Sequence, residues 1–187
     1  LARRAREIDS QVEIDMESSL YTDRTLAIAT QVAAEFGGIR CVIQAYLRRS
    51  QADIERLNQL GVEVRLCKGA YDESPGVAFP DKPDVDRNYL VLMKQLLDRG
   101  AYPAIATHDE AIIGETIRYA REKGIGADRF EFQMLYGIRR DLQRKVVNEG
   151  YRLRVYVPYG TAWYPYFLRR LAERPANASL ERVRSGV

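Results

Sequence analysis

Apolar residues along this chain alternate between two spacings, which predict strands and helices in turn. Short runs that are apolar throughout or at every second position predict strands at 11–16, 40–46, 62–67, 103–107, 130–134 and 153–157. Between them, apolar residues three or four positions apart predict helices at 22–36, 50–60, 86–99, 110–123, 140–149 and 163–173. A glycine follows most of these helical stretches, as is common where helices end. The chain is therefore expected to form six strands, each followed by a helix.

Local signals refine two of these segments. The helix at 50–60 is expected to begin with a capping box, Ser50 followed by Asp53, and to bury an apolar stripe that includes Leu60. The segment 72–83 contains three prolines and is long for a loop in a compact domain, which makes it a candidate lid or binding loop.

Strict alternation of strand and helix predicts a parallel sheet with helical crossovers. A doubly wound sheet and a (β/α)8 barrel both have this alternation. The polar residues favour the barrel, because they lie at or just past the C-terminal ends of strands, where barrel enzymes hold their active sites. These residues are Asp15, Gln44, Arg65, Lys68, Thr107, His108 and Gln133. We therefore expect an α/β fold of the (β/α)8 TIM-barrel type.

The number of strands limits this expectation. A closed barrel needs eight βα units, and six cannot close it. We expect the chain to hold about six of the eight units together with the final helix, and to lack the first two units, about a hundred residues. Residues 1–187 would then be a single barrel domain, the C-terminal portion of the whole. The alternative is an open six-stranded sheet that is complete by itself.

The composition excludes several classes of protein. Lysine and arginine total 29 and aspartate and glutamate 26, a net charge of +3 with interleaved signs, so no nucleic-acid partner is expected. No apolar run is long enough to span a membrane, and the first residues show no signal-peptide pattern. Cys41 and Cys67 lack disulfide or metal-binding spacing, as expected for reduced core residues of an intracellular protein. Because His108 is the single histidine, sites that need two histidines are excluded, and no metal site is expected.

Three polar residues in strand-like runs are candidates for ligand contact. Arg65 lies among apolar neighbours, and a buried arginine needs a partner. That partner would be an anion or an electron-rich heterocycle, or else a carboxylate, either Asp15 or Glu131. Asp15 itself would be an active-site ion-pair partner or the cap of the following turn. Gln44 needs hydrogen-bond partners, which a polar ligand or buried water could supply.

Further candidates directly follow strands or lie on the last helix. Lys68 could meet phosphate as a point charge or act as a Schiff-base nucleophile, and Gly69 would let the backbone approach a ligand closely. His108 would contact a ligand or make a structural hydrogen bond. Arg169 and Arg170 point about 100° apart on a helix, so both can bind one carboxylate only if the ligand docks against that helix edge.

Five segments, taken in order, resemble the proline dehydrogenase family, and most closely its compact, monofunctional bacterial members. The segments are 65–71 (RLCKGAY), 106–109 (ATHD), 131–137 (EFQMLYG), 156–160 (YVPYG) and 169–177 (RRLAERPAN). The resemblance covers nearly the whole chain. It implies a distorted (β/α)8 barrel that binds FAD non-covalently and oxidises L-proline to Δ1-pyrroline-5-carboxylate by hydride transfer to flavin N5. The electrons would then pass to a quinone.

The resemblance also implies roles for individual residues. Asp15 and Arg65 match catalytic positions. The positions that match FAD contacts are Met16, Gln44, Arg65, Lys68, Gly69, Ala70, Thr107 and His108. Arg169 and Arg170 match a pair that grips the substrate carboxylate, and the residues that match the wall around the proline ring are Leu135, Tyr156 and Tyr166.

The same resemblance implies a bacterial cytoplasmic protein, with any membrane contact peripheral and at the inner membrane. Two other functions stay open. One is a Schiff-base lyase that uses Lys68, and the other is a non-catalytic barrel fragment that binds neither FAD nor proline.

Overall fold

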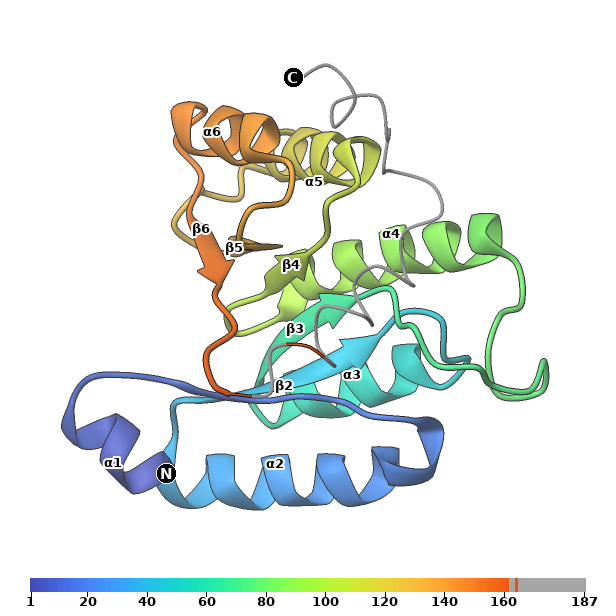
Figure 1. Ribbon diagram of the computed structural model, residues 1–187, viewed down its shortest axis with the longest axis vertical. Helices are drawn as coiled ribbons and strands as arrows, with labels where there is room; N and C mark the ends of the chain where they lie inside the picture. Colours follow the sequence, from blue (N-terminus) through green and yellow to red (C-terminus); the bar gives the residue numbers. More distant parts are fainter. Residues whose placement is uncertain (162–163, 165–187) are drawn as a thin grey trace. The chain divides into compact units, whose positions relative to one another are not determined.

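The computed structural model describes residues 1–161 and residue 164, and Figure 1 shows the path of the chain. The chain divides into two compact units, Leu1–Tyr156 and Val157–Val187, and every strand and helix named below belongs to the first. The helix predicted at 163–173 lies outside the described residues. Within the described part, no helix combines the length and the apolar character needed to cross a bilayer.

Six parallel strands form one sheet, in which their spatial order is the order along the chain. They are β1 (Val12–Ile14), β2 (Ile39–Gln44), β3 (Glu63–Cys67), β4 (Ala104–Ala106), β5 (Glu131–Leu135) and β6 (Leu153–Tyr156). The helices between them are α2 (Thr22–Phe36), α3 (Ser50–Gln59), α4 (Lys82–Arg99), α5 (Glu110–Lys123) and α6 (Arg140–Asn148). The predicted alternation is confirmed for these elements, although α4 begins before residue 86 because Pro83 fits its first turn. Two short elements went unpredicted, α1 (Ala2–Glu7) and the 3-10 helix η1 (Ser19–Tyr21).

The strand order identifies the architecture. A doubly wound sheet reverses its strand order at a switch point, whereas β1 to β6 follow one another without reversal. Because parallel crossovers are right-handed, an unreversed order places the connecting helices on one face, and α2 to α6 lie outside the curved sheet in Figure 1. The six strands form a half-barrel. The expected TIM-barrel type of fold is thus confirmed, and the doubly wound alternative is wrong.

The face of the sheet that meets the helices is apolar. Alternate strand residues such as Cys41, Leu66 and Phe132 are fully buried there. Tyr89 of α4 is also fully buried, and its hydroxyl donates to the backbone oxygen of Leu66 at 2.9 Å, which ties the helix to β3. This packed outer layer fixes the positions of the strands, and with them the residues that alternate onto the opposite, inner face.

The predicted ends of α3 are wrong in detail. Ser50 is the first helical residue rather than the cap, and its hydroxyl donates to the backbone oxygen of Gln44 at 2.6 Å. Asp53 accepts a hydrogen bond from Arg49 Nε at 2.7 Å and completes no capping box. Leu60 comes just after the last residue of the helix and is 52% exposed, so it is not part of the buried stripe.

The loop 68–81 connects β3 to α4 and is tied to the neighbouring loops. Ala78 forms an antiparallel bridge with Leu47, which follows β2. The Glu73 carboxylate accepts hydrogen bonds from the Ser19 amide at 2.7 Å and from the Ser19 hydroxyl at 2.6 Å. The loops that follow β1, β2 and β3 are therefore joined to one another at the C-terminal rim of the sheet.

Gly69 and Tyr46 together fix the turn that follows β3. Gly69 has a φ of +100°, and a Cβ at this position would lie 2.2 Å from Cδ1 of the Tyr46 ring. Glycine is the residue that satisfies both conditions, because it has no Cβ and adopts positive φ without strain. The Tyr46 ring lies close to Gly69 in this structure, and the approach of a ligand to Gly69 stays a prediction.

Replacing Gly69 with alanine is expected to destabilise the intact protein by about 2 kcal/mol or more, because the positive φ is strained and the new Cβ overlaps the Tyr46 ring. Gly76→Ala is the matched control in the same loop, since a Cβ there meets no atom within 4 Å. Its effect is expected to stay within about 0.5 kcal/mol. Urea unfolding measures both, and equal stability of the two variants would contradict the role of Gly69.

Candidate functional site

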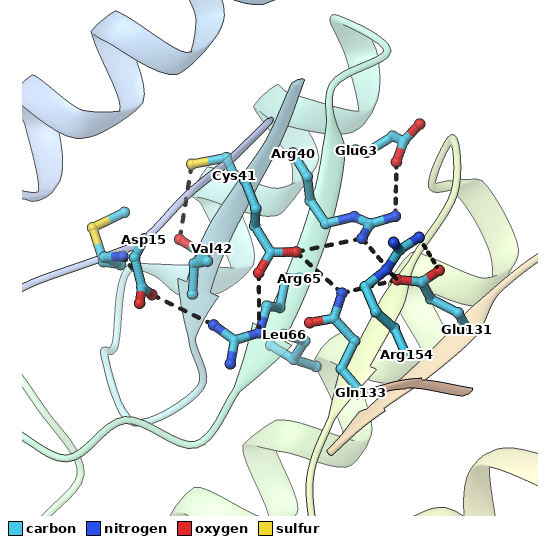
Figure 2. Close-up of polar contacts among 12 residues, drawn as sticks. Asp15, Arg40, Cys41, Val42, Glu63, Arg65, Leu66, Glu131, Gln133 and Arg154 are labelled. Carbon is cyan, nitrogen blue, oxygen red and sulfur yellow. Dashed lines mark hydrogen bonds and ion pairs between the residues drawn. The ribbon is translucent and has the colours of Figure 1, made fainter. Parts of the chain in front are cut away.

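The inner face of the half-barrel carries a group of charged and amide side chains. The strand register brings them together from five strands, although they are far apart in sequence. We call them the inner polar cluster, and its members are Glu13, Arg40, Glu63, Arg65, Glu131, Gln133 and Arg154, all of which except Glu13 are labelled in Figure 2. Its three arginines and three glutamates balance in charge.

Arg40 is the centre of the inner polar cluster and is only 1% exposed. Its Nη1 donates to Glu131 at 2.8 Å and to Glu13 at 3.3 Å, and its Nη2 donates to Glu63 at 2.9 Å. The guanidinium also lies over the Tyr102 ring, 5.6 Å from its centroid. A buried guanidinium is tolerated only when carboxylates compensate its charge, and here three of them do so.

Glu131 is shared between Arg40 and Arg154. Arg154 binds it in a two-pronged contact, with Nε at 2.7 Å and Nη2 at 2.9 Å from the two carboxylate oxygens. Burial acts to raise the pKa of Glu131, but the hydrogen bonds from Arg154 and Gln133 hold it below the usual value. The carboxylate is therefore charged and fully engaged, so the Glu131 partner considered for Arg65 is wrong.

Arg65 links the rest of the inner polar cluster to Asp15, which follows β1. Its Nε is 3.4 Å from Glu13 Oε1, and its Nη1 is 3.4 Å from Asp15 Oδ1, which confirms the alternative of an Arg65–Asp15 ion pair. The side chain is 16% exposed. Among the described residues its Nη2 makes no contact, and its buried Nε has no hydrogen-bond partner. Arg65 therefore presents an uncommitted donor at the rim (Figure 2).

Asp15 and Met16 directly follow β1. Asp15 Oδ1 accepts the Met16 amide at 3.0 Å as well as Arg65, and its side chain is 68% exposed. The helix-cap alternative for Asp15 is wrong, because the residue that precedes η1 is Ser18. Met16 is buried, and its backbone oxygen accepts a hydrogen bond from Gln44 Nε2 at 3.1 Å.

Gln44 ends β2 with half of its amide unpaired. Its Oε1 is buried and has no partner among the described residues. A buried carbonyl oxygen without a donor is unfavourable unless another molecule supplies one. Gln44 and Arg65 lie on neighbouring strands of the inner face, so an unpaired acceptor and an unpaired donor face the same side of the sheet.

Lys68 is held by two carboxylates rather than left as a nucleophile. Its Nζ is 2.5 Å from Asp86 Oδ1 and 2.9 Å from Asp109 Oδ2. Burial acts to lower the pKa of Lys68, but the hydrogen bonds to the two carboxylates raise it above the usual value. A Schiff-base lysine needs a neutral amine, which requires a lowered pKa. The structure therefore gives no support to the lyase alternative.

Thr107, His108 and Asp109 link the ends of β4 and β5 to α5. Thr107 Oγ1 accepts the Asp109 amide at 3.1 Å, and Asp109 Oδ1 caps α5 by accepting the amides of its first turn. His108 Nε2 accepts the Leu135 amide at 2.9 Å, which confirms its structural hydrogen bond. Ligand contact by Thr107 or His108 stays a prediction.

The remaining predicted residues fall into two groups. Leu135 and Tyr156 are paired in the β5–β6 register, and both end their strands at the C-terminal rim, while Ala70 is exposed after β3. The other substrate-contact predictions lie outside the described residues; these are Tyr166, Arg169 and Arg170. Their roles stay predictions.

Sequence analysis missed Glu13, Arg40, Glu63, Asp86, Asp109 and Arg154. Asp109 carried a recognisable signal, because an aspartate just before a helical stretch is a typical N-cap. Arg40 also had a signal in retrospect, since a charged residue heads an otherwise apolar strand. The identity of its partners depends on the strand register, which no local pattern supplies.

The Lys68–Asp109 pair predicts a pH dependence of stability. Partial burial acts to raise the pKa of Asp109, but Lys68 and the two helix amides hold it below 3.8, its ordinary value. The resulting stabilisation is complete above the unfolded-state pKa and is lost as the pH falls through the lower folded-state pKa. Asp109→Asn keeps the helix cap and is expected to lose about 1 kcal/mol at neutral pH.

Urea unfolding of the intact protein at several pH values measures this difference. It should shrink progressively once the pH falls below that ordinary value, whereas Asp109→Ala, which also removes the cap, should stay about 1 kcal/mol less stable than Asp109→Asn at neutral pH. A difference between wild type and Asp109→Asn that does not depend on pH would contradict the ionic role of Asp109.

Comparison with known proteins identifies the family. Residues 1–182 match the family model described as proline dehydrogenase. The chain is 51% identical over 175 residues to Proline dehydrogenase 1 of Bacillus subtilis (strain 168), which covers 94% of this chain and 58% of that protein. It is 49% identical over 178 residues to the proline dehydrogenase of Deinococcus radiodurans, covering 94% of this chain and 57% of that protein.

Solved structures agree with the fold. Proline utilization A (PutA) from Bdellovibrio bacteriovorus, inactivated by N-propargylglycine, superimposes with a TM-score of 0.87 at 32% identity, covering 98% of this chain and 22% of that one. A mutant PutA from Bradyrhizobium japonicum gives 0.84 at 28% identity, covering 95% and 21%. The chain thus spans a little over half the length of the curated relatives that it matches. It belongs to the proline dehydrogenase family.

Proposed function

We propose that the intact protein oxidises L-proline to Δ1-pyrroline-5-carboxylate, with FAD as the hydride acceptor, as the first step of proline catabolism. The observation that carries the proposal is the pair of unpaired groups at the rim, Arg65 Nη2 and Gln44 Oε1, in a chain of this family. A ligand with both acceptors and donors along one edge would satisfy both groups. The flavin ring is such a ligand.

The residues at the rim fit FAD. Gln44 Oε1 would accept from a ring N–H, and the Arg65 guanidinium would donate to the ring and stabilise negative charge that develops there. Lys68 has three donors, of which two are engaged by carboxylates, so one remains for a phosphate oxygen. The other proposed cofactor contacts are Met16, Gly69, Ala70, Thr107 and His108. FAD supplies the two-electron acceptor, which the protein's own side chains lack.

The substrate would be oriented by its carboxylate. Oxidation removes a hydride from proline C5 and a proton from its nitrogen, and a C5=N double bond forms. Arg169 and Arg170 would bind the single carboxylate, because a guanidinium fork matches its geometry. Leu135, Tyr156 and Tyr166 would wall the ring and exclude water. Asp15 would act as the partner of Arg65 in this site.

We further propose that residues 1–187 are part of one barrel domain, that a quinone accepts the electrons, and that the protein works in the bacterial cytoplasm with any membrane contact peripheral, at the inner membrane.

Purified intact protein is expected to be yellow, and anaerobic addition of L-proline should bleach the flavin absorbance and, with a dye present, reduce the dye. D-Proline is the control, because it presents the same atoms in the wrong arrangement for the carboxylate clamp. A folded protein that stays colourless after soaking in FAD, or a flavin that L-proline does not bleach, would overturn the proposal.

Arg170→Met is expected to raise KM for proline about 10- to 100-fold, because a charge-assisted hydrogen bond to the carboxylate is lost. Flavin content should be unchanged, and binding of tetrahydro-2-furoic acid, which has the carboxylate but no amine, should weaken in proportion. Arg144→Met, which replaces an exposed arginine of α6, is the control and should leave KM unchanged. Loss of flavin with an unchanged KM would contradict the clamp.

A further inference from the structure

We propose that Glu13 is the positioning residue for Arg65 and holds its guanidinium in place by connecting it to the buried Arg40. The inference rests on the proposed function, in which Arg65 acts at the rim, and it adds a residue that neither the sequence motifs nor the family comparison indicated.

The two carboxylate oxygens of Glu13 have different partners within the inner polar cluster. Oε2 accepts from Arg40 Nη1 at 3.3 Å and from Gln133 Nε2 at 3.1 Å. Oε1 lies 3.4 Å from Arg65 Nε and forms an ion pair with it that lacks hydrogen-bond geometry. The Arg65 side chain is long and rotatable, so a fixed orientation requires a fixed partner. Glu13 is fixed because its other oxygen is bound twice.

Asp15 accepts the one hydrogen bond that the Arg65 guanidinium makes among the described residues, at 3.4 Å, but it is the more exposed of the two partners. Its side chain is 68% exposed, whereas that of Glu13 is 27% exposed. Water and salt screen an exposed carboxylate, so its hold on a flexible guanidinium is small. We therefore assign the orientation of Arg65 to Glu13.

Arg40 supplies the rigid end of this connection. It is buried, and Glu63 and Glu131 hold it independently of Glu13. Removing the charge of Glu13 therefore leaves Arg40 with two carboxylates, while Arg65 keeps only the exposed Asp15. Loss of the Glu13 charge should therefore loosen the orientation of Arg65 and leave Arg40 in place.

Glu63 provides a matched control. It binds the same arginine, through Arg40 Nη2 at 2.9 Å, and its side chain is 26% exposed, close to the value for Glu13. It heads the neighbouring strand β3 and has no contact with the Arg65 guanidinium. Glu13→Gln and Glu63→Gln therefore remove the same charge from the same partner and differ in whether Arg65 loses a counter-charge.

The primary test measures the reactivity of Arg65 in the intact protein. Wild type, E13Q and E63Q are treated with phenylglyoxal, which modifies guanidinium groups, and the rate at Arg65 is followed by peptide mass spectrometry. E13Q is expected to raise this rate about fivefold, the change that corresponds to loss of a partly buried ion pair. E63Q is expected to leave it at the wild-type rate. Equal rates at Arg65 in wild type and E13Q would overturn the proposal.

A kinetic measurement separates positioning from general destabilisation. E13Q should lower kcat for proline oxidation about tenfold at unchanged flavin content, because a misplaced guanidinium weakens interactions in the transition state. E63Q should retain kcat even if both variants melt at lower temperature. A parallel fall of kcat in E63Q would assign the effect to stability and overturn the proposal.

Two provisions keep the test independent of other failures. Glu13→Asp keeps the negative charge but moves the carboxylate away from Arg65 by the length of one methylene. This variant replaces E13Q in the reactivity test if E13Q does not fold. An unchanged rate at Arg65 in Glu13→Asp would then overturn the proposal. An intact wild-type protein that does not oxidise proline would overturn the proposed function, while the rates at Arg65 would still decide the role of Glu13.

Discussion

The burial of the Arg40 guanidinium inside the half-barrel is the constraint on which the rest of the inner face depends. A buried charge is strongly destabilising without partners, and its carboxylates must come from other strands, since the side chain lies beside β1 and β3. A shift of β2 by one residue would turn Arg40 toward the helices, into an apolar layer with no carboxylate. The ion network therefore specifies the strand register, and the register in turn places the groups at the rim.

The inner face divides into a part whose charges balance and a part that keeps polar groups open to a ligand. In the inner polar cluster three arginines and three glutamates balance one another, which leaves little capacity for a ligand. Toward the C-terminal rim, Arg65 keeps one unpaired donor and Gln44 one unpaired buried acceptor. Groups that are held in place before a ligand arrives lose little entropy on binding. The inner polar cluster therefore serves as a rigid support for the groups at the rim.

Much of the fold could be predicted from the sequence, because apolar spacing reports directly which side of an element is buried. The six strands and the helices α2 to α6 follow from that spacing, and the polar residues after the strands correctly favoured a barrel. The errors arose where one residue had two possible roles. Ser50 binds Gln44 instead of capping, and Leu60 lies past the end of α3.

The partners of charged residues could not be predicted in the same way. Arg40 and Glu131 are 91 positions apart, and only the register of the intervening strands brings them together. The sequence offered Arg65 two carboxylates, Asp15 and Glu131, and gave no means of seeing that Arg40 and Arg154 already occupy Glu131. A charged residue within a strand interrupts the apolar pattern and carries no signal of its own role. For this reason Arg40, the centre of the inner polar cluster, was missed.

The contrast between Lys68 and Arg65 indicates which kind of chemistry the rim favours. Two short contacts compensate the charge of Lys68 and keep its amine protonated, which removes it as a nucleophile. Arg65 is held by two longer contacts at 3.4 Å and retains a free donor. A guanidinium is permanently charged and not nucleophilic, so it binds and stabilises rather than forming covalent bonds. The β1–β3 side of the rim therefore suits the proposed orientation of an electron-rich ligand, whereas Lys68, held protonated by two carboxylates, does not suit a covalent step.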